Sequence, residues 1–532
     1  MSTEAGAAGE SGEGATAEAD GIAYDSSAGR WVLAVAVLGS GLAFLDGTVV
    51  NVALPAIGED LDASTSSLQW ILNGYLLTLA SLILLGGSLG DRYGRRRIFV
   101  FGVAWFTVAS ALCAVAPSAD ALIFARLLQG IGGALLTPGS LAMIESSFKP
   151  GDRARAIGAW SGLGGVAAAL GPLLGGYLVD AISWRAIFLI NLPIGVFVVL
   201  MANRHVPETK DPTATGRLDV PGAFLAAVGL AGTTYALIEA PEQGFSPAIA
   251  VTAVGGVAAL IAFLVTERRS ANPMMPLTIF ASRQFSAANA VTFVVYAALG
   301  GVFFLLVSFL QISLGYSPIA AGAASLPVTV LMLLFSARSG ALATRIGAKI
   351  PLTIGPLVIA AGMLLMLRIA PGDSYVSTVL PAVIVFGVGL TLVVAPVTAT
   401  VLAAADARHS GVASGINNAV SRVAGLLAVA VLPVIAGLTG DDFYDPAAME
   451  DGFRIAMIAA AALAALGGVI AWLTIDAEVL AKDGGPEGEP ETRKLGDYHC
   501  GVAGAPLRSG RDDRLRPGSA DEPATVQGGA GI

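Results

Sequence analysis

Apolar segments of about 20 residues recur along almost the whole chain, and this recurrence restricts the possible folds more than any other feature. A segment of about 20 mostly apolar residues is long enough to cross a bilayer as an α-helix. Hydrophobic residues make up 55% of the chain and charged residues only 13%, whereas globular proteins carry about 25% charged residues. The sequence therefore predicts an all-α polytopic membrane protein with about fourteen spans.

The predicted spans form three groups that define the domain organisation. Six spans form a bundle over residues 30–203, two more follow a polar linker within residues 204–284, and six form a second bundle over residues 285–475. Residues 1–29 and 476–532 are rich in small, polar and charged residues, so we expect disordered tails there. The spans are expected at 31–57, 68–90, 98–116, 119–144, 154–179, 186–202, 220–240, 247–265, 286–312, 318–336, 350–369, 376–403, 411–438 and 453–473.

Loop charges indicate how the chain is oriented in the membrane. One alternate set of loops carries most lysines and arginines, including Arg95 and Arg345, whereas the opposite loops carry few. The positive-inside rule assigns the basic loops to the cytoplasm. We therefore expect a multi-pass protein of the cytoplasmic (inner) membrane with both termini in the cytoplasm.

A weak internal repeat relates the two predicted bundles. The pattern G-x-L-x-x-R-x-G occurs from Gly87 to Gly94 and again from Gly340 to Gly347, each time after the second span of a six-span set. Two repeated bundles related by an axis along the membrane normal are typical of transporters with a binding site at the midplane. A chance match between short Gly/Arg loops is the alternative.

The first span carries an acid, Asp46, and the fourth span carries a base, Arg126. Counted from the same membrane face, Asp46 lies about 14 Å deep and Arg126 about 10 Å deep, at 1.5 Å per residue. An ion pair at this depth would keep Asp46 ionised, and its loss would favour protonation. The sequence thus predicts a proton-coupling site, with a static structural pair as the alternative.

The loop after the second span contains Gly87, Asp91, Arg92, Gly94 and Arg95. Its glycines permit a tight turn and close helix approach, and Asp91 can pair with an arginine across the loop. We interpret these residues as a conformational latch between two bundle arrangements. The alternative is a loop that only sets topology.

The fifth span contains a glycine-rich segment with one proline: Gly171, Pro172, Gly175 and Gly176. Proline interrupts the helical hydrogen bonds and glycines allow another helix to pack closely. This pattern predicts a hinge at the bundle interface, a helix-packing face, or both.

Aromatic and amide side chains in several spans are candidates for a substrate cavity, although many such residues serve only in packing. Their chemistry suits a large, partly apolar ligand, including a cationic one. The candidates are Asn51, Asn73, Tyr75, Gln129, Asn191, Tyr296 and Gln311, with Asn417 and Asn418 as further possibilities.

Other function classes find little support in the sequence. No nucleophile–base set indicates an enzyme, no His/Cys cluster indicates a metal site, and no basic face with interleaved aromatics indicates nucleic-acid binding. We expect no cofactor and no catalytic residues. The expected partners are a small molecule, protons and the lipid bilayer, and the expected state is a monomer.

Taken together, the motifs resemble the major facilitator superfamily, specifically its fourteen-span drug:proton antiporter branch. The resemblance rests on Leu45, Asp46, Thr48 and Pro55; Gly87, Asp91, Arg92, Gly94 and Arg95; Arg126, Gln129, Gly130 and Gly132; Gly171, Pro172, Gly175 and Gly176; and Trp184, Arg185, Asn191 and Pro193. Thr344 departs from the repeated loop, where the first copy has Asp91, which indicates an asymmetric latch.

The resemblance implies two six-helix bundles plus two inserted helices. It also implies proton-coupled, multidrug-type efflux of amphipathic drugs or antibiotics by alternating access, with Asp46 and Arg126 coupling the proton. Two alternatives stay open. One is a dedicated exporter of an endogenous metabolite, such as a self-resistance product, siderophore or amino acid. The other is a membrane sensor that does not transport.

Overall fold

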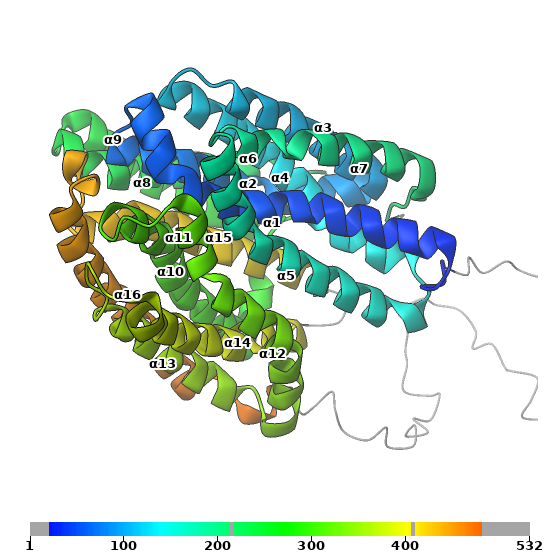
Figure 1. Cartoon of the computed structure of the whole chain (residues 1–532). Helices are drawn as coiled ribbons and strands as arrows, with labels where there is room; N and C mark the ends of the chain where they lie inside the picture. Colours follow the sequence, from blue (N-terminus) through cyan, green and yellow to red (C-terminus); the bar gives the residue numbers. More distant parts are fainter. Residues whose placement is uncertain (1–20, 212–216, 406–409, 481–532) are drawn as a thin grey trace, which may run out of the picture. The chain divides into compact units, whose positions relative to one another are not determined.

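The computed structural model describes residues 21–211, 217–405 and 410–480 (Figure 1). Most residues of the predicted tails lie outside these ranges. The helices are α1 (Ser27–Leu61), α2 (Thr65–Tyr93), α3 (Arg95–Ala114), α4 (Ala119–Ser147), α5 (Pro150–Ala181), α6 (Ala186–Leu189), α7 (Asn191–His205), α8 (Val220–Gln243), α9 (Pro247–Arg269), α10 (Arg283–Ile312), α11 (Pro318–Ala324), α12 (Leu326–Ile346), α13 (Lys349–Met366), α14 (Leu380–Ala403), α15 (Ser410–Ile435) and α16 (Pro446–Thr474).

Within the described ranges, fourteen helical segments are long and apolar enough to cross a membrane, which confirms the all-α polytopic class. The sixth of them is broken at Ile190, between α6 and α7. Pro193 explains the break, because a proline removes a helical N–H and clashes with the carbonyl four residues earlier. The break exposes backbone carbonyls that other helices can use.

Local sequence signals explain where many helices begin. Ser26, Ser64, Ser118 and Ser246 each accept a backbone N–H from the first turn of the helix that follows. Such N-caps satisfy donors that have no partner within the helix. The loops between spans can therefore be short without leaving helix ends unsatisfied.

The repeated Gly/Arg loop has the same backbone feature in both copies. Gly94 ends α2 with φ of 114°, and Gly347 ends α12 with φ of 86°. Positive φ strains most other residues, so glycine is required at both helix ends. The second loop has thus kept the turn of the first, although Thr344 replaces its acid.

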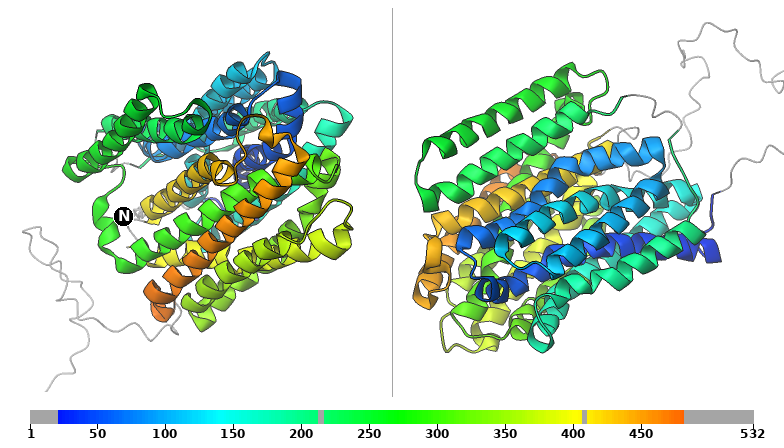
Figure 2. Two further views of the ribbon diagram at one scale, coloured as in Figure 1. Left: turned by 90° about the vertical axis from the view of Figure 1, so that its left-hand side faces the viewer. Right: turned by 90° about the horizontal axis from the view of Figure 1, so that it is seen from above.

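Helices α1–α7, here called the N-terminal set, pack chiefly through α1 with α5 and through α4 with α2 and α3. Helices α10–α16, the C-terminal set, pack through α10 with α15 and α16 and through α13 with α14. The α8–α9 hairpin lies along one flank, where α8 contacts α2 and α15 (Figure 2).

The two sets are hydrogen-bonded to each other at the end of the helices where α1 meets α2, here called the α1–α2 side. Side chains and backbone groups of both sets contribute, and apolar residues of α1, α2 and α10 share one core there. The bonds are Gln69–Val429 (2.8 Å), Gln311–Val52 (3.0 Å), Thr65–Gly440 (2.7 Å), Tyr444–Ala63 (2.6 Å) and Ile319–Asp180 (2.9 Å).

Two glutamates anchor the α8–α9 hairpin to the start of α2. Glu239 accepts the Trp70 indole N–H at 2.9 Å, and Glu242 accepts the Ser66 backbone N–H and hydroxyl at 3.1 and 2.7 Å. Hydrogen bonds to charged acceptors are the stronger class in proteins. The hairpin is therefore tied to the N-terminal set at the α1–α2 side.

Substituting Trp70→Phe keeps the apolar ring but removes the donor to Glu239. We expect a local loss of about 1 kcal/mol at the α8–α2 contact, seen as faster amide hydrogen exchange in α8. Trp105→Phe is the matched control, because its indole donates instead to the Leu128 carbonyl, at 2.8 Å. Unchanged exchange in α8 of Trp70→Phe would argue against this anchor.

Candidate functional site

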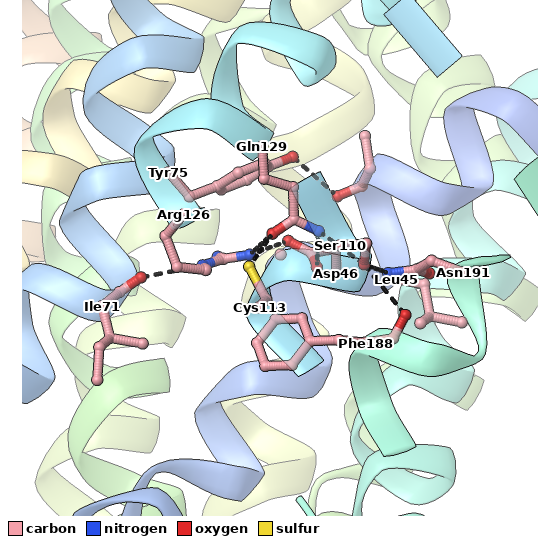
Figure 3. Close-up of polar contacts among 12 residues, drawn as sticks. Leu45, Asp46, Ile71, Tyr75, Ser110, Cys113, Arg126, Gln129, Phe188 and Asn191 are labelled. Atoms are coloured by element: carbon pink, nitrogen blue, oxygen red, sulfur yellow. Dashed lines mark hydrogen bonds and ion pairs between the residues drawn. The ribbon is translucent and has the colours of Figure 1, made fainter. Parts of the chain in front are cut away.

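A buried ion pair joins α1 and α4 (Figure 3). An Nη1–H of Arg126 donates to Asp46 Oδ2 at 2.5 Å, and both side chains are almost fully buried, at 1% and 0% exposure. The Arg126 Nε–H donates to the Ile71 carbonyl of α2 at 3.0 Å. A charge buried in this way requires a counter-charge and further hydrogen bonds, and this site provides both.

Gln129, one turn after Arg126, completes the site. Its amide donates to the second carboxylate oxygen of Asp46 at 2.8 Å, and its carbonyl accepts from Arg126 at 2.6 Å. Both oxygens of Asp46 therefore accept a hydrogen bond, an arrangement that stabilises the ionised carboxylate.

Further polar groups connect Gln129 to α3 and to the break between α6 and α7. Gln129 donates to Ser110 Oγ at 3.2 Å, and Asn191 donates to the same hydroxyl at 2.9 Å. Ser110 in turn donates to the Phe188 carbonyl at 3.1 Å. The break at Ile190 thus supplies a carbonyl to this network. Side chains of α1, α3, α4 and α7 and carbonyls of α2 and α6 share one buried polar cluster.

The aromatic ring of Tyr75 covers the ion pair on one side. The Arg126 guanidinium lies 4.5 Å from the ring centroid, a cation–π distance. Tyr75 is itself buried, and its hydroxyl donates to the Ala43 carbonyl at 3.4 Å. The ring helps to exclude water from Asp46.

The structure distributes the predicted cavity residues among different environments. Tyr75, Gln129 and Asn191 belong to the buried cluster around Asp46. Asn51 is half-buried and bonded to its own helix, and Gln311 bonds the Val52 carbonyl across the two sets.

The other two predicted cavity residues are Asn73 of α2 and Tyr296 of α10. Asn73 is fully buried and neither polar atom of its amide has a partner. Tyr296 is half-buried on α10.

Sequence reasoning missed Ser110 and Cys113 as members of the cluster. The thiol of Cys113 donates to the Gln129 carbonyl oxygen at 3.6 Å. The sequence contained a signal for both residues, because Ser110 and Cys113 are three residues apart and therefore share a helix face. It also missed Arg422, a half-buried arginine within the span formed by α15.

Replacing Gln129 by Met should destabilise the protein, because one oxygen of a buried carboxylate loses its donor. We expect about 1–3 kcal/mol of lost stability, measured as a lower unfolding midpoint of the purified protein. Gln69→Met is the control, since Gln69 donates only to backbone carbonyls of α15. A Gln129→Met midpoint equal to that of the wild type would contradict this account.

The loop between α2 and α3 is docked onto the segment after α7. Asp91 pairs with Arg95 at 2.8 Å within the loop, while Arg96 bonds Glu208 and the Val206 carbonyl. A Cβ at Gly94 would lie 2.6 Å from a Glu208 oxygen, so the close approach also requires glycine there. Gly87 lies beside Pro138 of α4, and Arg92 contacts the Tyr93 ring.

The glycines of α5 allow two different helices to approach. A Cβ at Gly171 would strike the Thr48 hydroxyl of α1, and one at Gly175 would lie 2.5 Å from Val49. On the other face, a Cβ at Gly176 would lie 2.5 Å from the Pro318 carbonyl oxygen of α11. The α5 segment is therefore packed against both helix sets.

Solved structures share this arrangement of helices at low sequence identity. A peptide transporter solved with sulfate has a TM-score of 0.63 and 16% identity, covering 86% of this chain and 98% of its own. A bacterial homologue of the human lysosomal transporter Spinster, solved in an inward-facing, unoccupied conformation, has a TM-score of 0.61 and 18% identity, with the same coverage.

Several sequence relatives have a higher sequence identity to this chain than these solved structures do. A puromycin resistance protein of Streptomyces alboniger is 35% identical over 469 residues, covering 85% of this chain and 92% of its own length. A methylenomycin A resistance protein of Bacillus subtilis is 37% identical over 457 residues, covering 85% and 96%. The sequence pattern of the Major Facilitator Superfamily matches residues 36–429. The chain therefore belongs to the major facilitator superfamily, as its motifs predicted.

Proposed function

We propose that this protein exports amphipathic drugs or antibiotics across the cytoplasmic membrane in exchange for protons. The observation that carries the proposal is the buried Asp46–Arg126 pair. An ionisable pair inside a membrane is costly and usually marks an ion or substrate pathway. The relatives support the substrate class. Two of them are named as resistance proteins for puromycin and methylenomycin A, and a third is named as a tetracenomycin C resistance and export protein.

The basic loops support an orientation with the α1–α2 side facing the exterior. The two helix sets then act as the two bundles of an alternating-access transporter, and hydrogen bonds such as Gln69–Val429 close the exterior side. This conformation corresponds to an inward-facing state that receives substrate from the cytoplasm or the inner leaflet. Such rigid-body rocking around a central site is the usual motion of repeat-built transporters.

Proton exchange at Asp46 drives the cycle in this proposal. In the described state both oxygens of Asp46 accept hydrogen bonds, from Arg126 and Gln129, and in this proposal the carboxylate is ionised there. In this proposal, α1 also shifts relative to α4 within the N-terminal set when the two sets rock. This shift separates the pair in the exterior-facing state, and protonation becomes favourable there. The return to the inward-facing state restores the pair and releases the proton to the cytoplasm.

The loop residues Gly87, Asp91, Arg92, Gly94 and Arg95 serve as the conformational latch. In this state Asp91 is paired within its own loop, with Arg95. A different Asp91 partner in the exterior-facing state would give the two states separate stabilising contacts.

The proposal is tested by drug uptake into inside-out vesicles from an efflux-deficient bacterium that expresses the chain. We expect uptake of at least one compound from a panel that spans cationic, neutral and anionic aromatics when respiration acidifies the vesicle interior, and loss of uptake with an uncoupler that collapses the whole proton gradient. Vesicles with empty vector are the control. If a proton gradient stimulates uptake of none of the compounds, the drug-export proposal fails and a dedicated metabolite exporter becomes the better hypothesis.

A further inference from the structure

We propose that Arg422 of α15 binds an anionic group, a carboxylate or an acidic phenol, of the exported compound. This inference rests on the proposed export function and names the charge of its substrates. Arg422 lies twelve residues after Ser410, the first residue of α15, which is about 18 Å along the helix. It therefore lies near the middle of a membrane span, where an arginine is expensive and usually functional.

Arg422 has no counter-charge in this conformation. Across residues 21–211, 217–405 and 410–480, no carboxylate forms an ion pair with it, and its Nε–H is buried without an acceptor. Arg126, by contrast, has a carboxylate, an amide and a carbonyl as partners. A half-buried guanidinium with unused donors is suited to bind an anion from outside the protein.

Three helices from both sets meet around Arg422. Helix α15 packs against α2 of the N-terminal set and against α10 of the C-terminal set. On α15, Val429 bonds Gln69 of α2 and Leu426 packs with Leu77 of α2. Arg422 lies one turn from Leu426 on the same side of α15, so it lies on the face of α15 that contacts α2.

A polar face of α15 leads to Arg422 from the basic side of the molecule. Ser414 and Asn418 precede Arg422 by eight and four residues, so all three lie along one face. Asn418 is exposed, and Ser414 and Ser421 are half-buried. One turn further, a Cβ on Gly425 would meet no heavy atom within 4 Å. In the inward-facing state this face provides a hydrated route to the guanidinium.

An unpartnered amide lies close to the same point. Asn73 of α2 is one turn from Gln69 and one turn from Leu77, which both contact α15. It is fully buried, and both polar atoms of its amide lack a partner. Buried polar atoms normally have partners, so Asn73 is available to a ligand that also reaches Arg422.

These groups together specify a ligand class. A guanidinium binds a planar carboxylate through two parallel hydrogen bonds, and the half-buried ring of Tyr296 on α10 can contact an aromatic or apolar body. An unpaired positive charge repels cations. The sequence-based expectation that included cationic ligands rested on aromatic and amide residues, and Arg422 favours the opposite charge.

Three probes with one ring system test the charge preference: anthracene-9-carboxylate, its methyl ester and 9-(aminomethyl)anthracene. Binding of each to the purified full-length protein in nanodiscs, without a gradient, is measured by fluorescence. We expect the wild type to bind the carboxylate at least about tenfold more tightly than the ester, the equivalent of 1.4 kcal/mol, and the amine most weakly.

Arg422→Gln should lose this preference, and Arg422→Lys should keep part of it. Arg338→Gln is the matched control, because Arg338 is exposed on α12 and its loss changes the net charge equally. A preference that persists in Arg422→Gln, or a wild type that does not favour the carboxylate, would overturn the inference. Folding is checked by the unfolding midpoint, and Arg422→Lys decides the case if Arg422→Gln does not fold.

The two proposals can fail separately. If the vesicle assay shows proton-driven efflux but the probes reveal no charge preference, the Arg422 inference fails and the export function stands. If the charge preference is present but no compound is exported, the export function fails while the anion site remains.

Discussion

Asp46→Asn should abolish proton-driven efflux, lowering it at least about 100-fold to the level of empty vector, while the protein still folds and binds substrate. The asparagine carbonyl can accept the hydrogen bond from Arg126, but the side chain cannot bind or release a proton. Removing a group that acts once per cycle stops the cycle, and a 100-fold loss corresponds to about 2.8 kcal/mol. Resistance, vesicle uptake and substrate binding are measured at matched expression.

Proton release gives a second readout of the same variant. Substrate added to purified wild-type protein in weak buffer should change the proton occupancy of Asp46, and a pH indicator should report it. Asp46→Asn should give no signal. Asp120→Asn, which changes an acid in the first turn of α4, is the matched control. Efflux that continues in Asp46→Asn would make Asp46 a structural acid.

A static ion pair predicts a different pattern of stability. Breaking a buried pair by removing one charge costs about 3–5 kcal/mol, so Asp46→Asn would then unfold at clearly lower temperature. Asp46→Asn/Arg126→Gln, which removes both charges, would regain much of that stability. A transporter that cycles through neutral Asp46 already tolerates Arg126 without its counter-charge, so we expect a small loss in the single variant.

Gly322→Val should hold the transporter open on the α1–α2 side and reduce efflux at least about tenfold. Gly322 of α11 faces α5, and a Cβ there would strike the Pro172 carbonyl oxygen. Because the clash involves backbone atoms, a side-chain rotation cannot relieve it. The substitution destabilises the described arrangement, in which α5 and α11 cross closely, but not a state in which the two helices are apart.

The expected shift towards a state that is open on the α1–α2 side can be measured by the accessibility of a cysteine introduced in place of Gln69. Gln69 is 3% exposed and bonded to α15 in the closed arrangement. The native Cys113 and Cys500 are first replaced. An impermeant maleimide added from the α1–α2 side should then label Gln69→Cys slowly, and the labelling should be faster when Gly322→Val is also present. Gly255→Val is the control, since a Cβ at Gly255 of α9 meets no atom within 4 Å. Equal labelling rates in both backgrounds would contradict this role of the crossing.

The sequence was most informative about features that depend on a residue's depth in the membrane. Hydropathy indicated the spans, and counting residues from the membrane face predicted similar depths for Asp46 and Arg126, which the structure joins in an ion pair. The family motifs were also sufficient for family membership, which the comparisons confirm. These features depend on local composition and on the fixed rise of a helix.

The direction in which a side chain points around its helix was harder to predict than its depth in the membrane. Tyr75, Gln129 and Asn191 were expected at a substrate cavity, yet they surround Asp46 in the buried cluster. Which neighbour a helix face meets depends on tertiary packing, which hydropathy does not report. Arg422 was not predicted for another reason: the second bundle has no acid deep in a span that would have indicated a charge pair with it.

The unpaired charge of Arg422 also bears on the energetics of export. If an anion leaves on Arg422 while one proton enters on Asp46, each cycle moves two positive charges inward. Each charge gains about 2.3 kcal/mol per 100 mV of membrane potential, so anion export gains about 4.6 kcal/mol per 100 mV. Export of a neutral compound would gain half of this, and export of a cation would gain none. The electrical potential of the cell, and not only its pH difference, would then select which compounds the protein removes most effectively.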